Sequence, residues 1–146
     1  MMKYGVVFFT RTNTSKKVAE KISNKLSCEL IQITDNINWK GILGFFKAGY
    51  YSSRNKPVDI QVHGNLDAVD EYIVVAPLWA GGLAPAIKTL LKTVPIEKVH
   101  LVVTSIGNHV KDRSGYKSVH DITKITGNED LVIDDLVNSL STGKVN

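Results

Sequence analysis

The sequence predicts an α/β protein in which helices cover both faces of a parallel β-sheet. Short runs of apolar, β-branched and aromatic residues recur along the chain, as in strands that are buried on both faces. Segments with apolar residues at helical spacing follow several of these runs, and strands that alternate with helices favour parallel pairing. The 146 residues suffice for one full hydrophobic core, so we expect a single domain over residues 1–146.

The first third of the chain reads as strand, helix, strand. Tyr4–Phe9 (YGVVFF) is a short apolar run and predicts a buried strand. A helix is predicted from about Ser15 to Leu26, and Glu29–Thr34 (ELIQIT) alternates like a second strand. The apolar residues at helical spacing are Val18, Ala19, Ile22 and Leu26.

The middle of the chain contains one clear strand. Asn38–Tyr51 is apolar and aromatic, and we interpret it as a helix. Ser52–Asp70 is rich in turn residues, and Glu71–Ala76 (EYIVVA) predicts a third buried strand. A loop is expected over Pro77–Gly82. The weak alternation inside the turn-rich region is carried by Val58, Ile60 and Val62.

The last third lacks room for one expected helix. Pro85 suits the first turn of a helix whose apolar face is Ile87, Leu90 and Leu91. Val99–Thr104 predicts a fourth strand, and a fifth is expected within Ser118–Thr126. A final helix covers about Asp130–Leu140. Since no helix fits between strands four and five, we expect an uncovered apolar patch on the sheet and a possible homodimer through that face.

Composition and charge exclude several classes of protein. The chain is 43% hydrophobic, and its 18 basic and 14 acidic residues give a net charge of +4, which favours anionic partners weakly. The basic residues form no stripe interleaved with aromatics, so we expect no nucleic-acid binding. The apolar runs are too short to span a bilayer, and the single cysteine, Cys28, cannot form an internal disulfide. We therefore expect a cytoplasmic protein without a membrane span.

Three loops should meet at one edge of the sheet. They follow the first, third and fourth predicted strands and cover Thr10–Ser15, Pro77–Gly82 and Ser105–Gly115. In open α/β sheets, ligands bind outside the carboxyl ends of strands where the winding reverses. In the strand order 2-1-3-4-5 this reversal lies between strands one and three, so we expect the three loops to surround one cleft.

The first loop has the character of an anion site. Five of its six residues carry a hydroxyl or an amide, and the sixth is Arg11. The first backbone N–H groups of a helix have no partner within it, and the helix dipole adds positive charge there. Lys16 and Lys17 are unfavourable in a first turn unless an anion is bound. An ordinary Ser15 cap with solvated lysines is the alternative.

Other phosphate-binding motifs do not fit this loop. The chain has no G-x-x-x-x-G-K-[ST], and no G-x-G-x-x-G follows the first strand. No acidic pair ends that strand, as a phosphoacceptor receiver domain would need. Cys28 lies after the first helix rather than in a phosphate loop, which excludes a cysteine phosphatase.

The stretch FFTRTNTSKKVAE resembles the signature of the flavodoxin family, an apolar strand followed by [ST]-x-T-G-N-T and a helix. The resemblance implies that Thr10, Thr12, Thr14 and Ser15 hold the phosphate of flavin mononucleotide (FMN). Asn13 stands where the family has glycine, and asparagine is the other residue that tolerates a left-handed backbone.

The resemblance continues in two further loops. APLWAGGLAPAIKTLL is similar to the family's loop after strand three, which implies that Trp79 packs on the isoalloxazine ring and that the loop's glycines approach it. A core tryptophan is the alternative. TSIGN, residues 104–108, is similar to the third flavin loop, where backbone amides would contact the pyrimidine edge. The implied contacts beyond the first loop are Pro77, Leu78, Trp79, Ala80, Gly81, Ser105, Ile106, Gly107 and Asn108.

The family resemblance implies a flavodoxin-like three-layer sandwich with a five-stranded parallel sheet in the order 2-1-3-4-5. It implies FMN as the cofactor and transfer of electrons between redox partner proteins. Two alternatives stay open: an FMN-dependent NAD(P)H:acceptor oxidoreductase acting on a small-molecule acceptor such as a quinone, and an interaction module that has lost flavin. Electron-carrying flavodoxins are typically acidic, whereas this chain is basic.

No catalytic residue or metal ligand is assigned from the sequence, because the flavin would supply the redox chemistry. The four histidines are not at metal-ligand spacing, and we interpret them as structural or solvated. A proton relay by His109 and a flavin cap by Tyr116 are the less favoured alternatives. The histidines are His63, His100, His109 and His120.

Overall fold

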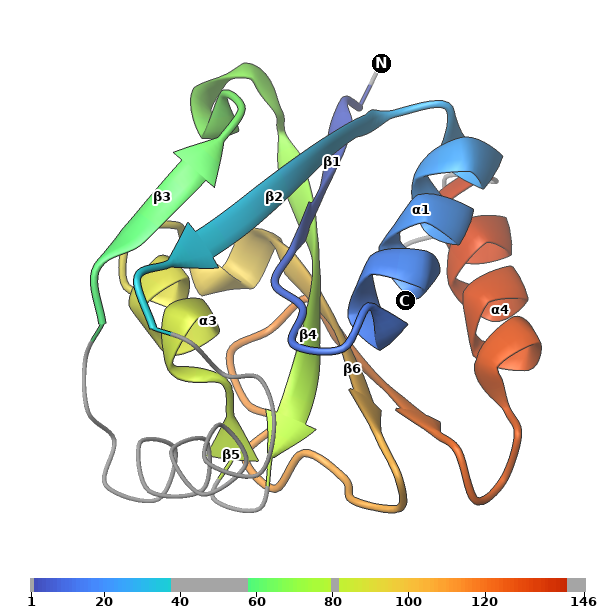
Figure 1. Cartoon of the computed structure of the whole chain (residues 1–146). Helices are drawn as coiled ribbons and strands as arrows, with labels where there is room; N and C mark the ends of the chain where they lie inside the picture. The colour runs from blue at the N-terminus through green and yellow to red at the C-terminus, as the bar shows by residue number, and fades with distance from the viewer. Residues whose placement is uncertain (1, 38–57, 80–81, 142–146) are drawn as a thin grey trace.

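A sheet of mainly parallel strands organises the fold (Figure 1). The computed structural model describes residues 2–37, 58–79 and 82–141. The elements are β1 (Tyr4–Phe8), α1 (Thr14–Leu26), β2 (Glu29–Asp35), β3 (Ile60–His63), β4 (Glu71–Trp79), β5 (Gly82–Leu83), α3 (Pro85–Leu91), β6 (Val99–Ser105), β7 (Ser118–Thr123) and α4 (Glu129–Ser141), with short 3₁₀ turns at Leu66–Ala68 and Ile96–Lys98. The helix expected over Asn38–Tyr51 lies outside the described residues.

The strand order confirms the predicted doubly wound topology and adds two strands to it. The order is β3-β2-β1-β4-β6-β7, and β2, β1, β4, β6 and β7 pair in parallel, which is the predicted order 2-1-3-4-5. The expectation of an entirely parallel sheet is wrong, because β3 runs antiparallel to β2 at the edge and β5 pairs antiparallel with β4. β3 is mostly exposed to solvent, so few of its side chains need to be apolar, and its alternation is weak.

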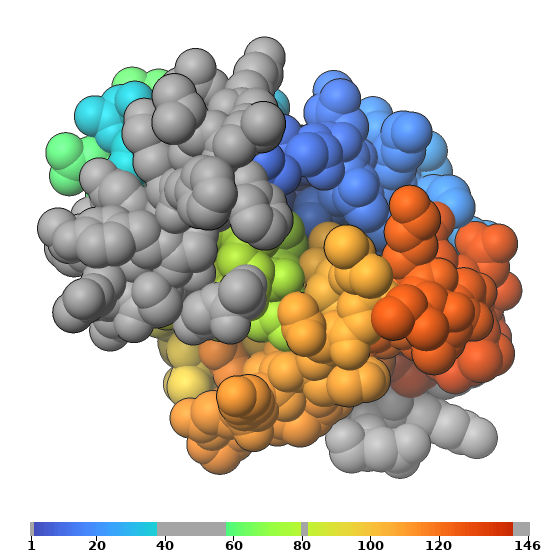
Figure 2. Space-filling view, turned by 60° about the horizontal axis from the view of Figure 1, so that its bottom comes forward, coloured from blue at the N-terminus to red at the C-terminus, as the bar shows by residue number. Residues whose placement is uncertain are grey.

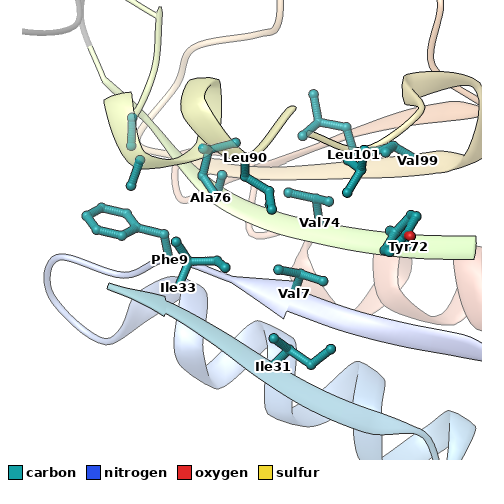
Figure 3. Packing of buried hydrophobic residues seen from close by; sticks show 14 of the residues in the cluster. Val7, Phe9, Ile31, Ile33, Tyr72, Val74, Ala76, Leu90, Val99 and Leu101 are labelled. Carbon is teal, nitrogen blue, oxygen red and sulfur yellow. The ribbon is translucent and has the colours of Figure 1, made fainter. Parts of the chain in front are cut away.

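Two hydrophobic clusters separate the layers. On one face, α1 and α4 lie side by side and bury the alternate residues of β1, β4 and β6 together with Ile22 of α1 and Leu136 of α4. On the other face, α3 packs on the opposite set of strand residues (Figure 3). Val7, Ile31, Val74, Leu90 and Leu101 of this second cluster are completely buried. Each helix therefore buries its apolar stripe against the sheet, as the sequence periodicity predicts.

The predicted absence of a helix between β6 and β7 is confirmed. Residues 106–117 run from β6 to β7 without one, and Val110 and Tyr116 from this connection pack against the cluster beneath α3. Leu101 and Val103 of β6 are consequently 0% exposed. The uncovered apolar patch that suggested a homodimer is therefore not found over these strands, because the connection itself covers them.

Side chains close the free edge of β7. Arg113 donates to the carbonyl of Val119, and Asn128 accepts from the N–H of Thr123 and donates to the carbonyl of Asp121. In a parallel strand, every second residue directs its backbone N–H and C=O to the same side. The carbonyls of residues 119 and 121 and the N–H of residue 123 therefore all point to the side of β7 away from β6. Because side chains already hydrogen-bond to these groups, fewer backbone groups on this edge are available to pair with a strand of a second chain.

We expect Asn128→Ala to destabilise the protein by about 1–3 kcal/mol, because it leaves two backbone groups of β7 without partners. Asn24→Ala on the exposed side of α1 provides the control and should change stability by no more than about 0.5 kcal/mol. Chemical denaturation of both variants measures the difference. Equal stabilities would show that Asn128 does not hold the edge of the sheet.

A buried polar cluster lies at the amino end of the sheet. Glu71, the first residue of β4, is 5% exposed, and its carboxylate accepts from Lys117 Nζ at 2.8 Å and pairs with His100 Nε2 at 2.8 Å. His100 Nδ1 lies 2.7 Å from Ser118 Oγ, which lies 2.9 Å from His120 Nε2. His100 and His120 thus have structural roles, and His100 lies near the end of the sheet opposite the predicted site.

No described helix has the length and the apolar composition needed to cross a membrane.

Candidate functional site

The predicted site residues gather at the carboxyl ends of three neighbouring strands. β1, β4 and β6 are adjacent in the sheet, and their ends lead to the segments 9–15, 77–79 and 105–108. Figure 2 views this end: the blue segment after β1, the yellow-green end of β4 and the orange segment after β6 border one another there. The winding reverses between β1 and β4, where open α/β sheets bind ligands.

The start of α1 has the features of an anion site. Asn13 caps the helix with a left-handed backbone, φ 68° and ψ 0°, and its side chain accepts no hydrogen bond from the first turn. The first turn contains no acidic residue, and Lys16 and Lys17 are exposed in it. Uncapped N–H groups and two cations leave this helix end positively charged, a state that an anion would stabilise.

The left-handed backbone at position 13 suits asparagine, and it suits glycine, the residue in the motif that this loop resembles. We expect Asn13→Gly to be nearly neutral for stability, because glycine adopts this conformation without strain. Asn13→Val should cost about 1–2 kcal/mol, since a β-branched residue is strained at positive φ. Thermal unfolding of the two variants measures the difference. A valine variant as stable as the glycine variant would contradict the role given to this backbone turn.

The hydroxyls of the first loop have different environments. Thr10 Oγ1 is buried, and within the described parts of the chain it is the buried side-chain oxygen or nitrogen without a hydrogen-bond partner. Thr12 and Thr14 are exposed, and their hydroxyl oxygens lie 3.5 Å apart. Ser15 differs from its predicted role, because its side chain is 1% exposed and its Oγ lies 2.9 Å from Thr104 Oγ1. Its hydroxyl therefore ties α1 to the end of β6, which leaves the backbone N–H for a ligand.

The second segment is a strand and not the predicted loop. Pro77, Leu78 and Trp79 continue β4, and Leu78 and Trp79 pair with Leu83 and Gly82 of β5. β1 has already ended at Phe8, opposite Val75, so Pro77 leaves no β1 hydrogen bond unmade. The hairpin brings the chain back through Gly82, whose φ of 124° suits glycine.

Trp79 lies at the end of this strand extension, half-buried, with Phe9 at its edge. The two rings are 6.2 Å apart at an interplanar angle of 71°. This edge-to-face contact packs one side of the indole against Phe9, the residue just before the first loop. Ala80 and Gly81, which the sequence also assigned to the site, lie outside the described residues.

The third segment is a braced turn. Ser105, the last residue of β6, donates its hydroxyl to the carbonyl of Asn108 and accepts from the N–H of Asn108, both at 2.9 Å. Ile106, Gly107 and Asn108 are exposed. These two hydrogen bonds close the turn at the carboxyl edge of the sheet, where its backbone amides can face a ligand.

Asp121 anchors the chain that follows this turn. Its carboxylate accepts from the N–H of Val110 and pairs with Arg113, and His109 Nδ1 lies 3.4 Å from it. Burial raises the pKa of Asp121, but the hydrogen bonds and the charge of Arg113 lower it further, so the net shift is downward. Asp121 was not singled out from the sequence, because no local pattern indicates that its carboxylate meets Val110 and Arg113.

The geometry suits a phosphorylated ligand with a flat apolar portion. The positively charged start of α1 fits a phosphate group, and the loop that leads into it contains the buried, unpartnered hydroxyl of Thr10. Trp79 and the exposed third turn lie at the ends of adjacent strands, where they can contact a planar ring system. Over residues 2–37, 58–79 and 82–141, no three His, Cys, Asp or Glu side chains come together as a group that could hold a metal.

The chain resembles known proteins in its structure and not in its sequence. No protein-family profile matches the sequence, and no curated protein matches it. A putative flavoprotein from Bacteroides uniformis superimposes with a TM-score of 0.73 at 17% identity, over 92% of this chain and 97% of the other. A flavodoxin, WrbA-like protein from Agrobacterium tumefaciens gives a TM-score of 0.51 at 11% identity, over 99% of this chain and 100% of the other. The chain has the flavodoxin-like fold.

A flavoprotein from Lactobacillus acidophilus, crystallised in complex with FMN, shares this flavodoxin-like fold. Its TM-score is 0.62 at 20% identity, over 84% of this chain and 91% of the other. These identities are low, so the common feature is the architecture. The fold class expected from the sequence is confirmed, with the corrections at β3, β4 and β5 given above.

Proposed function

We propose that this flavodoxin-like protein binds FMN non-covalently and carries electrons between redox partners. The observation that carries the proposal is the loop leading into α1, which combines an uncapped, cation-bearing first turn with the buried and unpartnered hydroxyl of Thr10. A phosphate would satisfy the helix N–H groups and this hydroxyl together. The FMN complex of the Lactobacillus acidophilus flavoprotein, which has the same fold, supports the choice of ligand.

Each segment of the site has a role in holding the cofactor. The first loop holds the phosphate through hydroxyls and backbone N–H groups, Trp79 covers one face of the ring, and the third turn meets the pyrimidine edge. When bound, FMN accepts and donates electrons at its ring, and the protein positions it and sets its electrostatic surroundings. The assigned residues are Thr10, Arg11, Thr12, Asn13, Thr14, Ser15, Pro77, Leu78, Trp79, Ala80, Gly81, Ser105, Ile106, Gly107 and Asn108.

The exposure of the third turn favours an electron carrier, which must be reached by a partner protein, over an enzyme that encloses its substrate. Ile106 is 71% exposed, and Gly107 and Asn108 beside it are also exposed. A cofactor edge held at this turn would lie near the surface, where a partner could approach it. We place this carrier in the cytoplasm, in keeping with its single cysteine.

Titration with FMN tests the proposal. Binding should shift the visible absorption of the flavin and quench its fluorescence, with saturation at one FMN per chain. Riboflavin, which lacks the phosphate, should bind at least about tenfold more weakly, since it leaves the start of α1 without an anion. No binding of FMN would contradict the proposal. Steady oxidation of NADPH by the isolated FMN-loaded protein would favour the NAD(P)H:acceptor oxidoreductase instead.

A further inference from the structure

A serine, a histidine and a glutamate form a chain of hydrogen bonds near the amino end of the sheet. Ser118 Oγ lies 2.7 Å from His100 Nδ1, and His100 Nε2 lies 2.8 Å from Glu71 Oε1. The three residues belong to β7, β6 and β4, which are neighbours in the sheet, and Ser118 pairs with His100 in register. A hydroxyl on one imidazole nitrogen and a carboxylate on the other is the arrangement that activates a nucleophile.

The carboxylate fixes the direction of the protons along this chain. An ionised carboxylate only accepts hydrogen bonds, so His100 Nε2 carries the hydrogen that it donates to Glu71. In the neutral imidazole the Nδ1 atom is then an acceptor, and the hydroxyl of Ser118 donates to it. The proton of Ser118 therefore already points at a base, as the attack of its oxygen on an electrophile requires.

His120 supplies a further donor beside the same oxygen. Its Nε2 lies 2.9 Å from Ser118 Oγ, and because the Ser118 proton is used on His100, the hydrogen in this contact comes from His120. Burial lowers the pKa of His120 below 6.5, so its ring is neutral at pH 7 and keeps one N–H. An N–H at this position can stabilise negative charge that develops on an oxygen next to Ser118 Oγ.

The exposure of the three residues suits these roles. Glu71 and His100 are 5% and 4% exposed, whereas Ser118 is only half-buried in the edge strand β7. Lys117 donates to the second carboxylate oxygen of Glu71 at 2.8 Å and so holds the carboxylate in place. The base and its orienting group are shielded from water, and the serine has the largest exposed fraction of the three.

We propose that Ser118 is a nucleophile that hydrolyses small carboxylic esters, with His100 as its general base and Glu71 as the positioning residue for His100. The half-burial of Ser118 restricts the acyl group to a short one. This activity is independent of the proposed FMN site, because that site lies at the carboxyl ends of the strands and this cluster lies near their amino ends.

The reaction needs only the ester and water. Ser118 Oγ forms a bond to the carbonyl carbon as its proton passes to His100 Nδ1, and Glu71 stabilises the resulting imidazolium. The bond between this carbon and the alcohol oxygen breaks, and the alcohol leaves with the proton. Water then attacks the acyl-serine and gives a proton to His100. The carboxylic acid leaves as Ser118 Oγ takes that proton back.

Labelling with a fluorophosphonate tests the proposal, because this reagent forms a stable ester with an activated serine. We expect peptide mass spectrometry to locate the label on Ser118 of the wild-type chain, a result that does not depend on the folding of any variant. Ser114 is the internal control, since it is exposed and its hydroxyl donates to the carboxylate of Asp112 rather than to an imidazole. It should stay unlabelled.

Three variants divide the roles, each checked for folding by circular dichroism. Ser118→Ala should remove the label and most of the hydrolysis of p-nitrophenyl acetate, and Ser118→Cys should restore acyl transfer through a thiolate. His100→Gln should slow the labelling of Ser118 about 100-fold or more, because the general base is lost.

Glu71→Gln tests the positioning role of the carboxylate. It removes a negative charge beside the imidazole, so the pH midpoint of the labelling rate should move to lower pH. The other ionisable side chains that surround the pair, Lys117, His120 and Tyr4, are unchanged in this variant. A purely structural role would reduce the amount of folded protein and leave the midpoint unchanged.

The absence of a label on Ser118, or equal labelling of Ser118 and Ser114, would overturn the proposal. So would equal labelling rates in the wild type and in folded His100→Gln.

Discussion

Replacing Thr10 with valine is expected to weaken FMN binding about 10-fold to 100-fold and to make the flavin-free protein more stable. The hydroxyl of Thr10 is buried without a hydrogen-bond partner, and an unsatisfied buried hydroxyl costs about 1–3 kcal/mol. Valine has nearly the same shape and removes this cost. In the FMN complex the same hydroxyl would donate to a charged phosphate oxygen, an interaction worth about 1.5–3 kcal/mol.

Two titrations and one unfolding experiment measure these opposite effects. FMN affinity should fall in Thr10→Val, and riboflavin affinity should stay the same because riboflavin has no phosphate. Thr89→Val is the control, since Thr89 Oγ1 already donates to the carbonyl of Val58 at 3.1 Å. This control should lose stability and keep its FMN affinity. A Thr10→Val protein that is less stable when flavin-free, with unchanged FMN affinity, would contradict the assignment of Thr10 to the phosphate.

Glu71→Gln is expected to destabilise the protein by about 3 kcal/mol at neutral pH. The substitution keeps the shape of the side chain but removes a buried negative charge that Lys117 and His100 both contact at 2.8 Å. Breaking a buried ion pair from one side leaves the other partner's charge uncompensated. Lys117 keeps 27% of its side chain exposed, so water compensates part of the loss. Urea unfolding at pH 7 gives the difference.

The pH dependence of this difference has a definite sign. Burial raises the pKa of Glu71, but hydrogen bonds and charges from Lys117 and His100 lower it further, so the folded pKa lies below the ordinary value of 4.5. The stability that Glu71 contributes is therefore fully present above pH 4.5 and is lost as the pH falls through the folded pKa. We expect the gap between wild type and Glu71→Gln to narrow in that acidic range.

Glu20→Gln serves as the matched control, because Glu20 is exposed on α1. Its stability should stay within about 0.5 kcal/mol of the wild type at every pH. If the gap between Glu71→Gln and wild type stayed constant down to pH 3, ionisation of Glu71 would not be the source of the stability.

Local patterns in the sequence were sufficient for most of the fold. The buried apolar runs of β1, β4 and β6 and the helical spacing in α1 depend on neighbours within one element, so periodicity reveals them. For Asn13, the expectation came from the family resemblance, since the resembling motif has a glycine at this position. The short distance between β6 and β7 was also enough to exclude a helix there.

Features that depend on distant partners could not be predicted in this way. Ser15 looked like a ligand-binding hydroxyl, but it meets Thr104, 89 positions away. The carboxylate of Glu71 meets Lys117, 46 positions away. Pro77 suggested a loop, yet β4 continues through it because β5 folds back on the strand. Such contacts require the sheet to be assembled before they can be recognised.

A crystal structure of the protein with FMN tests the central claim most directly. The account predicts that the phosphate lies at the amino end of α1, within hydrogen-bond distance of Thr10 Oγ1 and of backbone N–H groups in residues 11–15, with the ring beside Trp79. An FMN phosphate bound elsewhere on the chain, or a protein side chain occupying the start of α1 in the complex, would contradict it.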